Sequence, residues 1–221
     1  MKKLRIIMLG RPGSGKGTQA DLLAVKYNIA YIGMGAMLRE EIKKDTAIGK
    51  LIAPALSKGI LIPEKITDEL IKKRLQKQDC KKGYLLDGYP RNLAQARFLE
   101  TITKVNFVFD IVIEDDAVIE RLGGRLSCYC GEVYHIDTKP PRSDNKCDKC
   151  GKKLYARKDD NPKVIKHRLK VYHRQTEPLI KLYQSQGVLY RVNGNRAIEE
   201  IFEDIVRIIK KARKQENKKT I

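Results

Sequence analysis

The sequence predicts an α/β protein: a doubly wound, five-stranded parallel sheet that carries a helical insert and a cysteine-rich insert. Three observations support this prediction. Short apolar runs alternate with stretches of helical periodicity, which is typical of parallel βαβ units. The first apolar run, residues 4–9, ends in a glycine-rich loop with one lysine. Two close pairs of cysteines interrupt the alternation between residues 128 and 150.

The glycine-rich loop has the spacing of a P-loop. Gly10 is followed after four residues by Gly15 and then by Lys16. In this motif glycines let successive backbone N–H groups surround a phosphate, and the lysine reaches its outer oxygens. The residues that follow read as a helix, whose N-terminal end favours the same anion. The general motif places Ser or Thr directly after the lysine, but here Gly17 precedes Thr18.

A small helical lobe is expected at residues 33–62, between two elements of the core. Before it, residues 29–32 form a short second strand. Within it, apolar residues recur at helical spacing in two successive helices, 33–44 and 48–56. A helix that begins at Pro63 then returns the chain to the sheet.

The third strand, residues 83–87, ends in a single acid. Functional residues collect at the carboxyl ends of parallel strands. Beside a P-loop, Asp87 is therefore interpreted as an acid that orders magnesium-bound water, like a Walker B acid, rather than as a helix cap. The segment 88–91 follows, and the next helix carries Gln95, four residues past Arg91 and therefore expected on the same face.

The second half of the chain continues the alternation around the cysteine-rich insert. Asp115 and Asp116 are expected to cap the helix before the insert, and Asn161 with Pro162 to cap and start a long helix after it. The expected elements are a fourth strand at 105–113, a fifth strand at 188–192 and a last amphipathic helix at 197–212.

The cysteine-rich insert, residues 124–160, has the pattern of a zinc ribbon. Its two cysteine pairs are separated by sixteen residues, and each pair is followed by glycine: Cys128 and Cys130, then Cys147 and Cys150. Four thiolates at this spacing suit tetrahedral Zn²⁺. Disulfides are the rival interpretation, but reduced thiols are expected in a cytoplasmic protein. An insert this short cannot bury enough core to fold unaided, so the metal is predicted to be structural.

Composition bears on location and partners. Lys and Arg total 46 against 27 Asp and Glu, a formal net charge of +19. This balance could indicate a nucleic-acid or membrane partner, but the lysines are spread through every helix and concentrate only mildly in the tail, residues 210–219. There is no run of eighteen apolar residues and no leader pattern. We therefore expect neither a membrane span nor a signal peptide, and a cytoplasmic location.

The P-loop variant Gly-Arg-Pro-Gly-Ser-Gly-Lys-Gly-Thr, the strand ending in Asp87 and the cysteine insert together resemble the adenylate kinase family, in its long-lid, zinc-containing form. The resemblance covers nearly the whole chain. It implies the reaction ATP + AMP ⇌ 2 ADP with Mg²⁺, in a monomer whose partners are ATP, AMP and ADP. From the composition and the spread of the lysines we expect no membrane partner and no nucleic-acid partner. The resemblance also implies a kinase core over residues 1–221, an AMP-binding lobe at 33–62 and a zinc-binding lid at 124–160.

The resemblance further implies roles for individual residues. ATP would be held by Gly13, Ser14, Gly15, Lys16, Gly17, Thr18, Arg121, Arg125, Val133, Tyr134 and, near the adenine, Arg196. AMP would be held by Met34, Arg39, Ile60, Leu61, Ile62, Gly88, Tyr89, Pro90, Arg91, Gln95, Arg157 and Arg168. The catalytic set would be Lys16, Asp87, Arg91, Arg125, Arg157 and Arg168, and the zinc ligands Cys128, Cys130, Cys147 and Cys150.

The chain departs from the family pattern at three places. Residues 33–36 read Gly-Met-Gly-Ala where the family usually has Ser-Thr-Gly-Asp, so a hydroxyl near the AMP base and an acid near the magnesium site are missing. The first cysteine pair is one residue short, and Ile60 replaces a common lysine. Two alternatives stay open: a sister kinase with another acceptor or a GTP donor, and an RNA-binding zinc-ribbon protein. Gln95 favours adenine.

Overall fold

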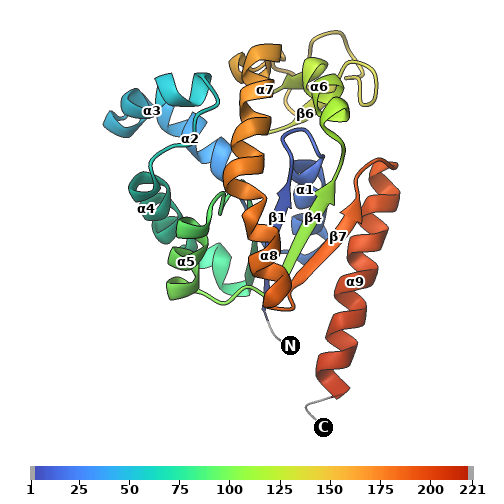
Figure 1. The fold of residues 1–221 in the computed structure, drawn as a ribbon. Coiled ribbons are helices and arrows are strands. Elements are labelled where there is room, and N and C mark those ends of the chain that lie inside the picture. The colour runs from blue at the N-terminus through green and yellow to red at the C-terminus, as the bar shows by residue number, and fades with distance from the viewer. Residues whose placement is uncertain (1–2, 219–221) are drawn as a thin grey trace.

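The computed structural model describes residues 3–218 and has a five-stranded parallel sheet at its centre (Figure 1). The strands lie in the order β2-β3-β1-β4-β7, with every neighbouring pair parallel. Their bounds are β1 Leu4–Gly10, β2 Ala30–Gly33, β3 Gly83–Asp87, β4 Phe107–Val112 and β7 Leu189–Asn193. The predicted fold class is confirmed, with strand ends within two residues of those expected.

The helices cover both faces of the sheet, because the apolar side chains of β1 point alternately to one face and the other. Ile6 and Met8 point to one face, where they pack with α1 (Lys16–Tyr27) and α9 (Ile198–Lys218). Ile7 and Leu9 point to the other, where the core includes side chains of two further helices: α5 (Leu93–Ile102) and α8 (Pro178–Ser185). Because successive side chains of a strand alternate between faces, an apolar residue at nearly every position is what a sheet covered on both sides needs.

The remaining elements form the lobe, the lid and their connections. The helices are α2 (Met34–Lys43), α3 (Ala47–Ser57), α4 (Glu64–Leu75), α6 (Asp115–Gly123) and α7 (Pro162–Val171), with 3₁₀ turns at Gln78–Lys82 and Lys158–Asp160. In the cysteine-rich insert, β5 (Arg125–Ser127) pairs antiparallel with β6 (Val133–His135). Lys219 of the lysine-rich tail lies outside the described residues. Within them, no helix combines the length and the apolar character that a membrane crossing needs.

Two helix ends differ from the prediction. The N-cap position of α6 is Glu114, without a side-chain cap, and Asp115 instead pairs with Arg11 Nε at 2.6 Å. The Asp115 carboxylate, which was expected to cap the helix, instead forms an ion pair with Arg11 on a neighbouring loop. After Asn161, which caps α7 as predicted by accepting from Val164 N, the expected long helix is interrupted.

The interruption is a π-helical turn, Tyr172–Thr176, between α7 and α8. Pro178, in the first turn of α8, has no N–H for the helical ladder, which favours a change of register before it. The turn also contacts the segment that follows β3, because the Thr176 hydroxyl donates to the carbonyl oxygen of Arg91 at 2.8 Å.

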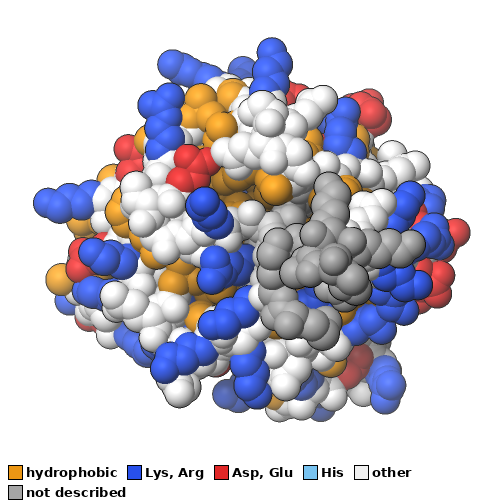
Figure 2. Space-filling model, turned by 90° about the horizontal axis from the view of Figure 1, so that it is seen from below, with side chains coloured by type: hydrophobic (Ala, Val, Ile, Leu, Met, Phe, Trp, Pro, Cys, Tyr) orange, Lys and Arg blue, Asp and Glu red, His pale blue; other side chains and the backbone are white. Residues whose placement is uncertain are grey.

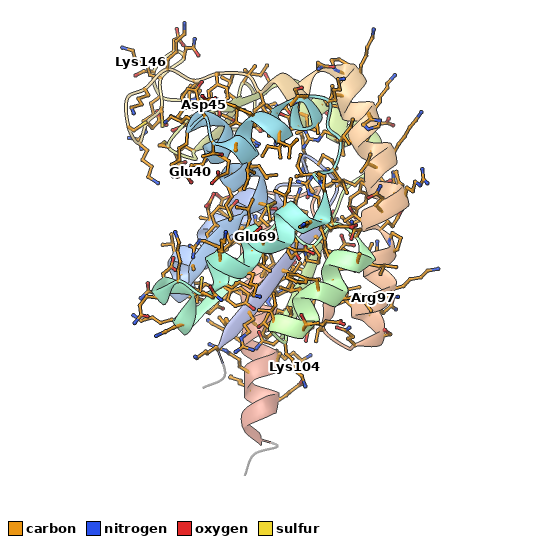
Figure 3. All side chains as sticks on the ribbon, turned by 90° about the vertical axis from the view of Figure 1, so that its left-hand side faces the viewer. Glu40, Asp45, Glu69, Arg97, Lys104 and Lys146 are labelled. Atoms are coloured by element: carbon orange, nitrogen blue, oxygen red, sulfur yellow. The ribbon has the colours of Figure 1, made fainter. Side chains whose placement is uncertain are left out.

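The lobe and the lid segments meet at one end of the molecule. Lys43 Nζ at the end of α2 lies 5.4 Å from the centroid of the Tyr129 ring in the insert, a cation–π contact. Helix α3 also contacts the 3₁₀ turn Lys158–Asp160. Figure 3 places Asp45 of the lobe and Lys146 of the insert at this same end. The two inserts therefore close over the carboxyl ends of the central strands.

Candidate active site

The loop between β1 and α1 is shaped for an anion. Gly10 has φ +138°, and a Cβ there would lie 2.6 Å from both the Ile111 carbonyl oxygen and Ser14 Oγ. Gly13 and Gly15 have φ of +77° and +86°, which side chains rarely adopt. The Ser14 hydroxyl is buried and has no hydrogen-bond partner within the described residues. A helix start without a side-chain cap and a buried, unused hydroxyl fit a bound phosphate.

Lys16 is the cation of this loop. Its Nζ donates to the carbonyl oxygen of Arg11 at 3.2 Å, so the amine folds back over the loop. Burial lowers the pKa of Lys16 to about 8, opposed by the nearby charge of Asp87 and assisted by three arginines. An anionic ligand would restore the charged form.

Asp87 stands at the carboxyl end of β3, as predicted, with Met8 of β1 opposite it. Its Oδ2 accepts from the Tyr31 hydroxyl at 3.1 Å. Its Oδ1 is buried without a hydrogen-bond partner among residues 3–218. A Cβ on Gly17 would lie 3.3 Å from Oδ2, so the carboxylate touches the first turn of α1. A buried carboxylate oxygen without a partner, beside the phosphate loop, fits the water shell of Mg²⁺.

Four predicted arginines gather opposite the P-loop. Arg125 makes two hydrogen bonds to Asp160, Nε to Oδ2 at 2.7 Å and Nη2 to Oδ1 at 2.5 Å. Arg168 Nη1 contacts Asp159 Oδ2 at 2.9 Å and Asp160 Oδ1 at 3.1 Å. These acids were not predicted as partners. Their carboxylates hold two guanidinium groups in place.

The positive charge in this cluster exceeds what the acids balance. Arg157 Nε donates to Ser127 Oγ at 2.7 Å, and burial followed by repulsion from Arg125 lowers the pKa of Arg157 to about 9. Burial also lowers the pKa values of Arg91 and Arg168, each with a further contribution from a neighbouring arginine. Buried cations that repel one another are stabilised by a polyanion, which is the kind of ligand the site is built to hold.

One cleft brings together residues predicted to bind ATP and residues predicted to bind AMP. It is lined by Met8, Leu9, Gly10, Pro12, Lys16, Gly59, Leu61, Gly88, Pro90, Arg91, Arg168, Val171, Tyr172 and Thr176. Close backbone approach makes this possible at Gly59, where φ is +69° and a Cβ would lie 2.7 Å from Arg168 Cγ. At Gly88 a Cβ would lie 3.1 Å from Arg91 Nη2. Glycine at both positions lets the arginines face the phosphate loop.

Gln95 has a fixed side-chain amide. Its residue is 3% exposed, Oε1 accepts from the Arg91 backbone N–H at 2.6 Å, and Nε2 donates to Thr67 Oγ1 at 3.1 Å. The Thr67 hydroxyl donates in turn to the Glu64 carbonyl oxygen at 3.0 Å. Arg91 precedes the helix, which Asn92 caps, so the link to Gln95 runs through the backbone and not along a shared helix face. Thr67 was not predicted, because the contact joins α4 to α5.

The other residues predicted to bind AMP differ in how deeply they are buried. Three belong to the hydrophobic core: Met34, Ile62 and Tyr89. Ile60 is exposed, whereas Leu61 and Pro90 line the cleft. The guanidinium of Arg39 lies over Gly35, where a Cβ would be 3.2 Å from Nη1.

The predicted donor residues beyond the P-loop are more dispersed. Arg121 Nη2 donates to the Gly194 carbonyl oxygen at 3.0 Å, and Arg196 forms an ion pair with Asp204. Val133 is half-buried on β6, and the Tyr134 hydroxyl accepts from Asp148 N at 2.8 Å within the core of the insert. A cavity at the carboxyl ends of β4 and β7 was missed by sequence reasoning, and its lining is Val112, Glu114, Arg191, Val192, Asn193 and Asn195.

The four cysteines converge on one point. Their sulfurs all lie within 4.8 Å of one another, with Cys128 to Cys150 at 3.4 Å and Cys130 to Cys147 at 3.5 Å. A tetrahedron with Zn–S bonds of ~2.3 Å has sulfurs roughly 3.8 Å apart. None of the cysteines in the described part of the chain forms a disulfide. The cluster fits zinc despite the short first pair, where Tyr129 turns outward, 64% exposed, to stack on Tyr155 at 4.5 Å.

A doubly wound parallel sheet with a P-loop, a strand-end acid and converging arginines at its carboxyl edge defines a P-loop nucleotide phosphotransferase. A sequence model of the family described as Adenylate kinase matches residues 8–188. The chain belongs to the adenylate kinase family. It is a kinase that transfers a phosphoryl group from ATP to AMP.

Similar proteins support this membership over most of the length. A protein named Adenylate kinase from Caldanaerobacter subterraneus subsp. tengcongensis is 44% identical over 208 residues, 91% of this chain and 94% of that protein. One from Archaeoglobus fulgidus is 43% identical over 214 residues, 94% of this chain and 99% of that protein. One from Methanosarcina barkeri is 43% identical over 213 residues, with the same two shares.

Proposed function

We propose that the reaction ATP + AMP ⇌ 2 ADP takes place in the cleft between the P-loop and the arginine cluster. The ATP phosphates bind at the P-loop with Lys16, and the AMP phosphate binds at Arg91 and Arg168. The observation that carries this proposal is the single cleft lined by all three of these cations. A site that holds the triphosphate of ATP end to end with the phosphate of AMP needs cations on both sides of the transferred group.

The chemistry needs positioning and charge stabilisation more than proton transfer. The attacking oxygen belongs to a phosphate that is already ionised, so no general base is required. Lys16 and the arginines stabilise the charge that spreads over the transferred group. When bound, Mg²⁺ would supply further neutralisation of the phosphate charge. Oδ1 of Asp87, which is buried and has no hydrogen-bond partner among the described residues, is the atom that would hold the water shell of this ion.

The arginines change partners when phosphates bind. Arg125 and Arg168 are held by Asp160 and Asp159, and a guanidinium group binds phosphate in the same bidentate manner as carboxylate. Arg157, whose pKa is lowered to about 9, has less compensating charge and gains more from an anion. Arg157 and Arg168 thereby bridge the two nucleotides during transfer.

The lobe and the lid exclude water during transfer. Hydrolysis of ATP would compete with transfer in an open cleft, so closure favours the productive reaction. Zinc at Cys128, Cys130, Cys147 and Cys150 has a structural role, because four protein ligands leave no open position. We further propose a cytoplasmic monomer, since one chain supplies the P-loop, the lobe and the lid.

Adenine recognition at the acceptor side is assigned to Gln95. With one hydrogen bond at each end, its amide keeps one N–H and one lone pair for a ligand. A neighbouring donor and acceptor match the N1 atom and the 6-amino group of adenine. The RNA-binding alternative gains no support from the face of the molecule seen from below. Figure 2 shows Lys and Arg side chains distributed over the face seen from below, with acidic and hydrophobic side chains among them.

Coupled phosphoryl transfer from ATP or GTP to AMP, CMP, UMP and GMP tests the proposal. We expect a strong preference for ATP with AMP. The variant Arg168→Lys should lower kcat by about 10²- to 10³-fold, because a point charge replaces a planar pair of donors. Arg174→Lys, at an exposed position in the neighbouring turn, serves as the matched control. Equal rates for the two variants would contradict the role of Arg168, and preference for another acceptor would contradict the role of Gln95.

A further inference from the structure

The Tyr31 hydroxyl is placed on the strand-end acid. Tyr31 lies on β2, whose register sets Gly33 opposite Asp87. Side chains two residues apart on a strand share a face, so the Tyr31 ring runs along β2 over Gly33. Its hydroxyl donates to Asp87 Oδ2 at 3.1 Å. The phenol therefore reaches the acid from a neighbouring strand.

Two glycines enclose this hydroxyl. A Cβ on Gly33 would lie 2.9 Å from the Tyr31 hydroxyl oxygen and 3.2 Å from Cζ. A Cβ on Gly17, in the first turn of α1, would lie 3.9 Å from the same oxygen. The phenol thus occupies the space that a side chain at position 33 would need. Glycine at position 33 and tyrosine at position 31 therefore fit one another sterically.

The hydrogen bond also determines which carboxylate oxygen is free. Burial, and after it the charge of Asp87, raise the pKa of Tyr31, so the phenol stays protonated and acts as a donor. Oδ2 of Asp87 is thereby occupied, and Oδ1 has no partner among the described residues. The orientation of the Asp87 carboxylate then determines which of its oxygens is available to magnesium-bound water.

We propose that Tyr31 is a positioning residue for magnesium: it holds Oδ2 of Asp87 so that Oδ1 stays available to the water shell of nucleotide-bound Mg²⁺. This inference rests on the proposed role of Asp87. Partners that orient metal-binding carboxylates commonly affect metal affinity by about 10- to 100-fold. Because the contact here is made through water, we expect the lower end of that range.

Calorimetric titration of the full chain with the β,γ-imido analogue of ATP, in MgCl₂ and in EDTA, tests this proposal. The ratio of the two affinities measures the coupling between metal and nucleotide. Tyr31→Phe should lower this ratio by about tenfold while leaving the affinity in EDTA unchanged. Tyr27→Phe is the matched control, because the Tyr27 hydroxyl is buried without a hydrogen-bond partner among the described residues. Asp87→Asn gives the loss expected when the acid itself is removed.

The outcomes separate the inference from the proposed function. If Asp87→Asn lowers the ratio and Tyr31→Phe leaves it within twofold of the original chain, Tyr31 is not a positioning residue, and the role of Asp87 stands. If Asp87→Asn also leaves the ratio unchanged, the proposed role of Asp87 fails and the inference fails with it. An equal loss of affinity in MgCl₂ and in EDTA for Tyr31→Phe overturns the inference, because it indicates damage to the cleft as a whole.

Discussion

Replacing Thr67 with valine should weaken the discrimination between 6-amino and 6-oxo purines. The Glu64 carbonyl can only accept, so the Thr67 hydroxyl donates to it, and the group of Gln95 that faces the hydroxyl oxygen must be a donor. The Arg91 N–H can only donate, so Oε1 of Gln95 must face it. Both constraints select the same amide orientation, and AMP fits that orientation. IMP, with N1–H and a 6-oxo group, needs the flipped amide.

The size of the effect follows from these two contacts. Thr67→Val leaves a buried N–H of Gln95 without an acceptor, which costs about 1 to 3 kcal/mol. The Arg91 N–H remains and still disfavours the flipped amide. We therefore expect only about 1 kcal/mol of the discrimination to be lost, which is roughly a fivefold fall in the ratio of kcat/KM for AMP over IMP.

The assay is coupled phosphoryl transfer to AMP and IMP with saturating Mg·ATP. Thr67→Ser keeps the hydroxyl and should keep the ratio, whereas Gln95→Leu removes the amide and should abolish most of it. A ratio that is unchanged in Thr67→Val but lost in Gln95→Leu would refute the orienting role of Thr67 alone. A fall of equal size for AMP and IMP would mean that the substitution affects packing between α4 and α5 and not recognition.

Three further predictions concern the P-loop, the lid and the lobe. Burial lowers the pKa of Lys16 to about 8, so the protonated amine becomes scarce above that pH. Calorimetry should then find that nucleotide affinity falls by up to about tenfold per pH unit. An affinity that does not change with pH would contradict this. Chelation of zinc should expose residues 124–160 to proteolysis before the sheet, and added Zn²⁺ should restore protection. Gly59→Ala should cost about 1 to 2 kcal/mol of unfolding free energy and also lower kcat, since its Cβ would displace Arg168. Gly187→Ala, with the same φ of +69° and no described atom within 4 Å of its Cβ, should affect stability only.

Local signals predicted most of the fold. Apolar runs such as Leu4–Gly10 identify buried parallel strands because both faces of the sheet are covered, and the P-loop glycines fix where the first strand ends. The cysteine spacing predicted a cluster that the structure brings within 4.8 Å. These features depend on residues close together in sequence, so their physics can be read from the chain itself.

Contacts between distant segments were not predictable in the same way. The pairing of Arg125 with Asp160 spans the insert, and the contact of Gln95 with Thr67 joins two helices. The acid at position 115 looked like a helix cap because nothing local reveals that Arg11 lies beside it. The roles assigned to individual nucleotide-binding residues stay predictions that the experiments above address.

Two acids, Asp159 and Asp160, place negative charge beside the arginine cluster. Asp159 and Asp160 form ion pairs with Arg125 and Arg168, so under the proposed function phosphate would exchange with carboxylate at these arginines. The net affinity would then be the difference between two strong interactions, and we expect it to stay moderate. As ADP departs, the carboxylates would pair with the guanidinium groups again. The two acids would thus compete with ADP for the arginines, which favours release of the product over tight retention.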